Sequence, residues 1–217
     1  MNLPNSLRFA ATLALASVSA HAFTETWTPD GDSQGWTSFA LADAYAHQQD
    51  LNGGLELSAV NYSRYFAIAD ADASGGAFTG DYLSFGSLTF DLTIAGTSTV
   101  DTLAVRLADS ASGHEWTYAL TFTLGATTQF SVPLFPAGTT GTGWSQQSGP
   151  NGDFLNALAS VEELSFVFDA ADTVGISENF LATLDNVTLV AIPEPSSFAA
   201  LAGLSTLGAA LARRRRR

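Results

Sequence analysis

The sequence has no cysteine and no lysine, and its body carries very few positive charges. Of the eight arginines, Arg8 lies near the N-terminus and five end the chain. Residues 23–192 therefore hold only Arg64 and Arg106 against 20 acidic residues, a net charge of −18. The missing cysteines exclude disulfides, thiolate nucleophiles and cysteine-held metals. The missing cations exclude nucleic acid as a partner, because binding to phosphates needs positive charge, and they argue against docking of the body on an anionic membrane.

The composition is otherwise that of a folded protein. Hydrophobic residues make up 46% of the chain and aromatic residues 11%, against 13% charged residues. This balance is typical of a globular domain and not of a disordered acidic tail. The body of about 170 residues is long enough for one domain with a substantial core. A folded acidic domain without thiols fits a protein that works outside the cell.

The first 22 residues are typical of a secretory signal peptide. Arg8 supplies the positive charge, an apolar stretch spans Phe9–Val18, and Ala20 and Ala22 form an A-x-A cleavage site. Cleavage there leaves Phe23 as the first residue of the mature protein. An ordinary N-terminal helix is the alternative.

The segment 192–217 has three parts in a fixed order. The motif Pro193, Glu194 and Pro195 is followed by an uncharged stretch, 197–212, rich in Ala, Leu and Gly, and the chain ends in Arg213, Arg214, Arg215, Arg216 and Arg217. As a transmembrane helix, this stretch would reach about 24 Å, somewhat less than the roughly 30 Å hydrocarbon core, and snorkelling arginines extend that reach. The arginines should stay in the cytoplasm, with the body on the far side of the membrane.

These three parts resemble the PEP-CTERM sorting signal of Gram-negative bacteria. The resemblance implies recognition by an exosortase, a membrane transpeptidase-like protease that cuts near the motif, and therefore only a transient stay in the inner membrane. It further implies a bacterium that makes exopolysaccharide, and a mature protein at the cell surface or in the extracellular matrix. A plain tail anchor is the alternative.

The body, residues 23–191, alternates apolar and polar residues with the period of half-buried antiparallel strands. Clusters of Gly, Asp, Asn and Pro separate the alternating runs, as turns require. One helix is expected over Phe154–Leu164, capped by Asp153, and a long polar loop over 138–152. The pattern predicts an all-β fold, a single β-sandwich of jelly-roll type with one short helix. The expected strands are 55–60, 65–68, 88–94, 103–107, 116–124, 130–134, 164–168 and 181–190.

Several short motifs of the body resemble laminin B and galactose-binding-like modules. They are Trp27, Gly35-Trp36, the entry at 53–55, the stretch 80–92 with its Leu-Ser-Phe, and the closing 184–189 with its Asp-Asn-Val. The resemblance implies a jelly-roll sandwich, often associated with recognition of carbohydrates or surfaces. The cysteines that flank laminin modules are absent, so nothing about laminin assembly carries over.

No catalytic residue is predicted. His47 and His114 are the only histidines of the body, and neither belongs to a zinc or nucleophile motif. His114 and Glu115 point to opposite faces if they lie on a strand, which makes a poor catalytic pair. Paired carboxylates for glycoside hydrolysis occur by chance among so many acids, and no spacing singles out two of them. The protein is therefore expected not to be an enzyme.

A structural calcium ion is the cofactor that the sequence allows, because Ca²⁺ prefers carboxylate and carbonyl oxygens. Asp70, Asp72 and Asp81 partly match a calcium loop, against the alternative of a plain turn. Asp185 shares strand parity with Val187 and is expected to point inward, where a carboxylate needs a partner or a metal. Galactose-binding-like modules often hold calcium between their first and last strands. That resemblance implies Asp185 and Glu25 as ligands. Hydrogen bonding of Asp185 to loop amides at the start of the strand is the alternative.

Exposed aromatic side chains would supply a sugar-binding platform, because the CH groups of a pyranose stack on aromatic faces. Trp144, in the expected polar loop, is the first candidate and Trp36 the second. Burial of these rings in the core is the alternative.

The sequence thus predicts an exported, exosortase-sorted β-sandwich protein of the cell surface or matrix. The first hypothesis for its role is a non-enzymatic protein that binds or accompanies exopolysaccharide in a biofilm. The second is a purely structural acidic protein bridged by calcium, and the third is an extracellular glycan hydrolase.

Overall fold

The computed structural model describes residues 23–27, 32–41, 45–51, 53–109, 112–134, 143–149, 154–170 and 179–192. The expected signal peptide and the sorting segment from Pro193 onward lie outside these residues. Within them, no helix is long and apolar enough to cross a membrane.

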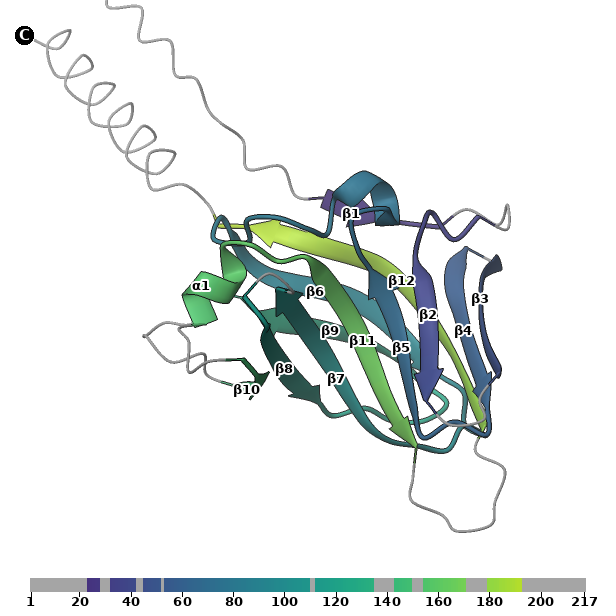
Figure 1. Ribbon diagram of the computed structural model, residues 1–217. Coiled ribbons are helices and arrows are strands. Elements are labelled where there is room, and N and C mark those ends of the chain that lie inside the picture. The colour runs from purple at the N-terminus through teal and green to yellow at the C-terminus, as the bar shows by residue number, and fades with distance from the viewer. Residues whose placement is uncertain are drawn as a thin grey trace, which may run out of the picture. The chain divides into compact units, whose positions relative to one another are not determined.

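The described strands pair into two antiparallel sheets that face each other as a β-sandwich (Figure 1). Sheet A has the order β3-β4-β12-β6-β9, and β1 pairs with β12 beyond the end of β4. Its strands are β1 (Phe23–Glu25), β3 (Tyr45–Leu51), β4 (Gly54–Val60), β6 (Phe85–Ile94), β9 (Thr127–Pro133) and β12 (Asn179–Ala191). Sheet B has the order β10-β8-β7-β11-β5-β2. Its strands are β2 (Thr37–Leu41), β5 (Arg64–Ala69), β7 (Val100–Asp109), β8 (His114–Leu120), β10 (Trp144–Ser148) and β11 (Glu163–Ala170). The predicted all-β jelly-roll sandwich is confirmed.

The core lies between the two sheets and is rich in aromatic side chains. The alternation of β6 buries every second residue, and its Phe90 meets Phe166 of the opposite sheet edge to face, with ring centroids 4.7 Å apart. Trp36 stacks on Phe166, with ring centroids 6.0 Å apart. Each such buried aromatic contributes about 1.5–3 kcal/mol of hydrophobic stabilisation, so the two sheets are held together without a disulfide.

The predicted helix is shorter than expected. The helix α1 spans only Phe154–Leu158, Val161 forms an isolated bridge with Gly80, and Leu164 already belongs to β11. The apolar residues from 161 to 168 suit a helix face and a doubly buried strand equally well. This segment forms a strand because it pairs with β5 on one side and with β7 on the other.

The expected loop over 138–152 contains a strand. β10 pairs with β8 and forms the edge of sheet B, and its bulge lies between Gln146 and Ser148. β8 itself ends at Leu120 and not at Leu124. Polar edge strands such as β10 lack the apolar alternation from which the central strands were predicted, and β1, β2 and β3 were not predicted either.

A bulge in β12 changes which residues face inward. Phe180, Ala182 and Leu184 are buried before it, and Val187 and Leu189 after it. Register shifts between Asp185 and Thr188, where Asn186 has a left-handed backbone with φ +53°. The extra residue of a bulge reverses which residues of the strand face the core. The alternation before the bulge therefore does not predict which side chains point inward after it.

Candidate functional site

The outer face of sheet B carries both arginines of the body. Its strands alternate between core and exterior, so every second side chain points outward. Pairing places Arg106 of β7 between Ser165 of β11 and Thr117 of β8. We call this surface the sheet B face; its outward residues are Arg64, Phe66, Thr102, Ala104, Arg106, Glu115, Thr117, Glu163, Ser165, Val167 and Asp169.

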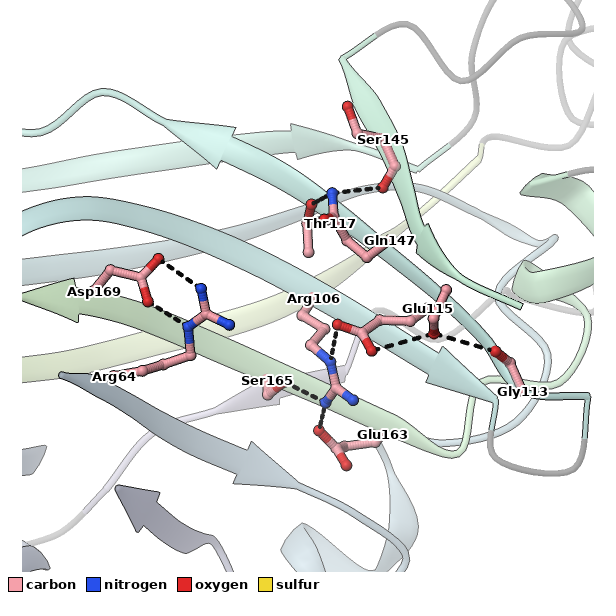
Figure 2. Close-up of polar contacts among 11 residues, drawn as sticks. Arg64, Arg106, Gly113, Glu115, Thr117, Ser145, Gln147, Glu163, Ser165 and Asp169 are labelled. Carbon is pink, nitrogen blue, oxygen red and sulfur yellow. Dashed lines mark hydrogen bonds and ion pairs between the residues drawn. The ribbon is translucent and has the colours of Figure 1, made fainter. Parts of the chain in front are cut away.

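Arg106 lies between two carboxylates at the centre of the sheet B face (Figure 2). Its Nε lies 2.9 Å from Glu115 Oε1, and its Nη1 donates to Glu163 Oε1 and, at 3.3 Å, to Ser165 Oγ. Its Cζ lies 5.8 Å from the centre of the Phe66 ring, a cation–π contact. The side chains of the three charged residues are 19 to 30% exposed. The Arg106 guanidinium thus holds two carboxylates in place, and all three side chains remain partly accessible to a ligand.

A second ion pair lies at one end of the same face. Arg64 Nε donates to Asp169 Oδ1, and its Nη2 donates to Oδ2 at 3.2 Å. Thr102 Oγ1 donates to the same Oδ2 at 2.9 Å. The hydrogen bond to Asp169 raises the pKa of the Arg64 guanidinium. A bidentate pair of this kind holds its geometry well.

Hydroxyl and amide groups line the β8–β10 side of the face. Gln147 Nε2 donates to Thr117 Oγ1 at 2.8 Å (Figure 2). The Ser148 hydroxyl lies 3.4 Å from Glu115 Oε2. Such groups can donate to and accept from the hydroxyls of a sugar. Together with the ion pairs, these groups give the sheet B face hydrogen-bond donors and acceptors in fixed positions.

The face is hollowed along its strands. A hollow of about 160 Å³ lies over Arg64, Phe66 and Ala104, and a second of about 310 Å³ lies over Ala108, Asp109 and His114. Both are lined by Arg106 and Glu115. Small residues make the space, because Ala104 and Ala108 carry only a methyl group where longer side chains would fill it.

A third hollow of about 550 Å³ continues toward the turn that follows β5. It shares Asp70 and Glu162 with the second hollow and is also lined by Asp72, Thr79 and Gly80. The three hollows are neighbours that share lining residues, and together we call them the trough. The trough runs from the Arg64 end of the sheet B face to the 3₁₀ turn η1 (Ala73–Gly76).

An exposed aromatic pair lies at the β2 edge of the face. Phe39 is 53% exposed and pairs across the strands with Phe66, with ring centroids 6.1 Å apart. Sequence reasoning missed this pair because it sought tryptophan and tyrosine in loops. The available signal was that Phe66 alternates with the buried Tyr65 and Ala67, so its ring has to point outward.

Neither of the two tryptophans predicted as a sugar platform offers an exposed face. Trp144 is 7% exposed, donates from Nε1 to the Pro133 carbonyl at 2.8 Å, and packs on Tyr118 and Phe154. Trp36 is 3% exposed and belongs to the central aromatic cluster. The large apolar surface of both rings is used for packing, so the expected exposed platform does not lie at these residues.

The acidic residues predicted as calcium ligands lie in different places. Asp70 and Asp81 each cap a turn, accepting from the Asp72 and Leu83 amides at 2.9 and 2.8 Å. Among the described residues, no group of three or more His, Asp or Glu side chains could hold a metal ion. Asp70, Asp72 and Asp81 are therefore not brought together as a carboxylate cage, and the carboxylates of Asp70 and Asp81 form Asx turns.

Asp185 does not point into the core as predicted. The bulge in β12 places it on the outer side of sheet A, directly opposite Asp91, and Asn186 Nδ2 bridges the two carboxylates at 3.3 and 2.8 Å. The parity argument was wrong because it carried the inward direction of Val187 back across the bulge. Asp185 is consequently separated from Glu25, whose side chain faces inward.

Glu25 is one of two buried carboxylates among the described residues, with 5% of its surface exposed; the other is Asp109. It accepts from the hydroxyl of Ser74 and, when the Gln34 amide nitrogen faces it, from that amide at 2.7 and 3.2 Å. Trp36 Nε1 in turn donates to Ser74 Oγ at 3.2 Å. Gln34 and Ser74 both have left-handed backbones, and the Ser74 amide donates to the Gln34 carbonyl at 2.7 Å. We call these three residues, Glu25, Gln34 and Ser74, the Glu25 cluster.

Comparison with known proteins gives a fold but no family. No protein-family profile and no curated protein matches the sequence. The family 11 carbohydrate-binding module from Clostridium thermocellum, in complex with a β-1,3-1,4-mixed-linked tetrasaccharide, matches with a TM-score of 0.53 and 12% identity over 79% of this chain and 97% of that one. The solution structure of CtCBM11 matches with a TM-score of 0.53 and 15% identity over 82% and 99%. At such identities the likeness establishes the shared β-sandwich alone.

Proposed function

We propose that this protein is an exported, non-enzymatic carbohydrate-binding protein whose ligand lies in the trough of the sheet B face. The observation that carries the proposal is the arrangement around Arg106, where two fixed carboxylates and a hydroxyl-rich strand edge flank a hollow next to an aromatic ring. Carbohydrate sites combine an apolar surface with a few precisely held polar groups. The similar module from Clostridium thermocellum, which holds an oligosaccharide, supports this choice among the functions open to the fold.

The proposal is tested by co-sedimentation of the purified full-length protein with the exopolysaccharide of its own cells. Saturable binding without release of reducing sugar is the expected result. Binding accompanied by release of sugar would favour a hydrolase. Absence of binding would contradict a carbohydrate role for that polymer.

Phe39 is expected to contribute to glycan binding through its exposed ring. Replacing it with alanine should weaken glycan binding about tenfold, because stacking on an aromatic ring is worth about 1–1.5 kcal/mol. The thermal unfolding midpoint should hardly change, since more than half of the side chain is already exposed. Isothermal titration and a melting curve measure the two effects. Leu181→Ala, at a residue 42% exposed on sheet A, is the matched control and should leave binding unchanged.

We propose further that the Glu25 cluster holds a structural calcium ion. A buried carboxylate is costly unless it is paired with a cation as well as hydrogen-bonded, and neither arginine in the described part of the chain forms an ion pair with Glu25. Rotation of the Gln34 amide by half a turn would bring its oxygen beside the Glu25 carboxylate and Ser74 Oγ, a set of oxygen ligands that suits Ca²⁺. The ion would then join β1 to the η1 turn.

Calcium should accordingly raise the melting temperature. At ten times the Kd, binding to the folded state alone contributes about 1.4 kcal/mol, or about 3–6 °C for a domain of this size. Differential scanning calorimetry with calcium and with EDTA measures the shift. Glu25→Gln should abolish it and Asp185→Asn should retain it; the opposite pattern would assign the ion to the β12 bulge.

Export and sorting are proposed on the terminal motifs. Signal cleavage after Ala22 and exosortase cleavage near Pro193-Glu194-Pro195 predict a mature surface or matrix protein that begins at Phe23 and lacks Arg213–Arg217. Intact mass spectrometry of the protein from its native cells measures both ends. A mature protein that keeps its arginine tail would contradict the exosortase step while leaving the binding proposal intact.

A further inference from the structure

The trough changes its charge along its length. The first hollow is lined by Arg64, Arg106, Glu115 and Asp169, which carry no net charge together. The second and third hollows are lined by one arginine and six carboxylates, Asp70, Asp72, Asp109, Glu115, Glu162 and Glu163. The ligand of the proposed function would therefore lie along a surface that becomes strongly negative.

The positive charges of the trough are already engaged. Arg106 is shared between Glu115 and Glu163, and Arg64 forms a bidentate pair with Asp169. No other lysine or arginine occurs in residues 23–192, where the net charge is −18. A carboxylate or sulfate on a ligand would thus meet no uncommitted cation there, and it would have to approach against the field of the whole domain.

From this charge distribution, and resting on the proposed function, we infer that the trough selects glycans without carboxylate, sulfate or phosphate groups and rejects acidic polysaccharides. Like charges brought together across an interface are a common means of excluding wrong partners. The hydroxyls of a neutral glycan carry no such penalty, and the carboxylates of the trough can accept hydrogen bonds from them. The acidity of the domain is then a specificity device as well as a source of solubility.

The test compares neutral polymers with acidic polymers of the same backbone. The full-length protein is titrated with a mixed-linked β-1,3-1,4-glucan, a galactomannan and a starch-type α-glucan, each also in a form oxidised at its primary hydroxyls to carboxylates. At least one neutral polymer should bind, and its oxidised form should bind at least about tenfold more weakly at low salt. Raising the ionic strength should narrow this difference, because salt screens repulsion between exposed charges.

A variant with fewer negative charges shows whether the oxidised polymer binds weakly because of charge repulsion or because its shape no longer fits the trough. The double substitution Asp72→Asn and Glu162→Gln removes two negative charges from the trough, and it should raise the affinity for the oxidised polymer, relative to the affinity for the neutral polymer, about threefold or more. The control, Glu56→Gln with Asp185→Asn, removes two charges from the outer side of sheet A and should leave the ratio of the two affinities near the wild-type value.

The outcomes distinguish this inference from the proposed function. Equal or tighter binding of the oxidised polymer, or an equal effect of the two double variants, overturns the charge selection and leaves carbohydrate binding in place. Absence of binding by every neutral and oxidised polymer counts against the proposed function itself, and the inference falls with it.

Discussion

Arg106→Met should weaken glycan binding about tenfold or more and lower the free energy of unfolding by about 2 kcal/mol. The substitution leaves Glu115 and Glu163 side by side without their cation. Breaking a fully buried ion pair costs about 3–5 kcal/mol, and the 19–30% exposure of these side chains reduces that cost. Isothermal titration measures the binding, and urea denaturation measures the stability.

Two further variants separate the binding effect from the stability effect. Arg106→Met combined with Glu115→Gln and Glu163→Gln removes the uncompensated charges, so it should recover most of the lost stability but not the binding. Arg64→Met breaks a more exposed pair, in which the arginine is 47% exposed, and should cost at most about 1 kcal/mol. Full binding by Arg106→Met would show that the ligand lies elsewhere.

Gly35→Ala should be the most destabilising small substitution in the domain, with a loss of about 3 kcal/mol or more. Gly35 has φ +81°, which L-residues rarely adopt. A Cβ atom there would lie 2.3 Å from the carbonyl oxygen of Asp72, which is backbone and cannot rotate away. The turn that carries Gln34 would have to move off the η1 turn, and the Glu25 cluster would open. Urea denaturation measures the loss.

Gly75→Ala is the matched control for this prediction. Gly75 has a similar φ of +67°, but no atom lies within 4 Å of the position that its Cβ would take. Only the backbone cost remains, about 1 kcal/mol. Equal losses for the two alanine variants would show that the close packing of Gly35 on Asp72 does not contribute to stability.

The alternation of apolar and polar residues in the sequence predicted the central strands well. β6, β7 and β11 carry unbroken alternation or a continuous apolar run, and the pairing of such strands leaves little choice of face. The edge strands β2 and β10 are short and mixed in character, so nothing in their own residues distinguishes them from loops. The residue at which α1 ends likewise could not be predicted locally, because it depends on strand pairing with residues that are distant in the sequence.

The candidate site was less accessible to sequence reasoning than the fold. Arg64 and Arg106 stood out as the only cations of the body, but their pairing with Asp169, Glu115 and Glu163 depends on cross-strand register. The bulge at Asn186 could not be anticipated from alternation, and it reversed the expected direction of Asp185. Trp144 belongs to β10 at the edge of the sheet B face, yet its ring is buried against Tyr118 and Phe154.

Burial explains why the expected and observed aromatic residues differ. A tryptophan ring contributes most to stability when it is buried, and the buried rings of Trp36 and Trp144 pack against other aromatic rings. Phe39 lies on the edge strand β2, where no further strand covers it in the described sheet. An exposed apolar ring beside fixed polar groups is unusual on a free surface and suits a recognition surface.

The most direct test of carbohydrate binding on the sheet B face is an NMR titration of the ¹⁵N-labelled protein with the glycan that it binds in co-sedimentation. The account predicts saturable shifts of backbone amides in β5, β7, β8 and β11, centred on Arg106, with the amides of β6 and β12 unchanged. Shifts confined to sheet A, or no shifts at saturating glycan, would contradict it.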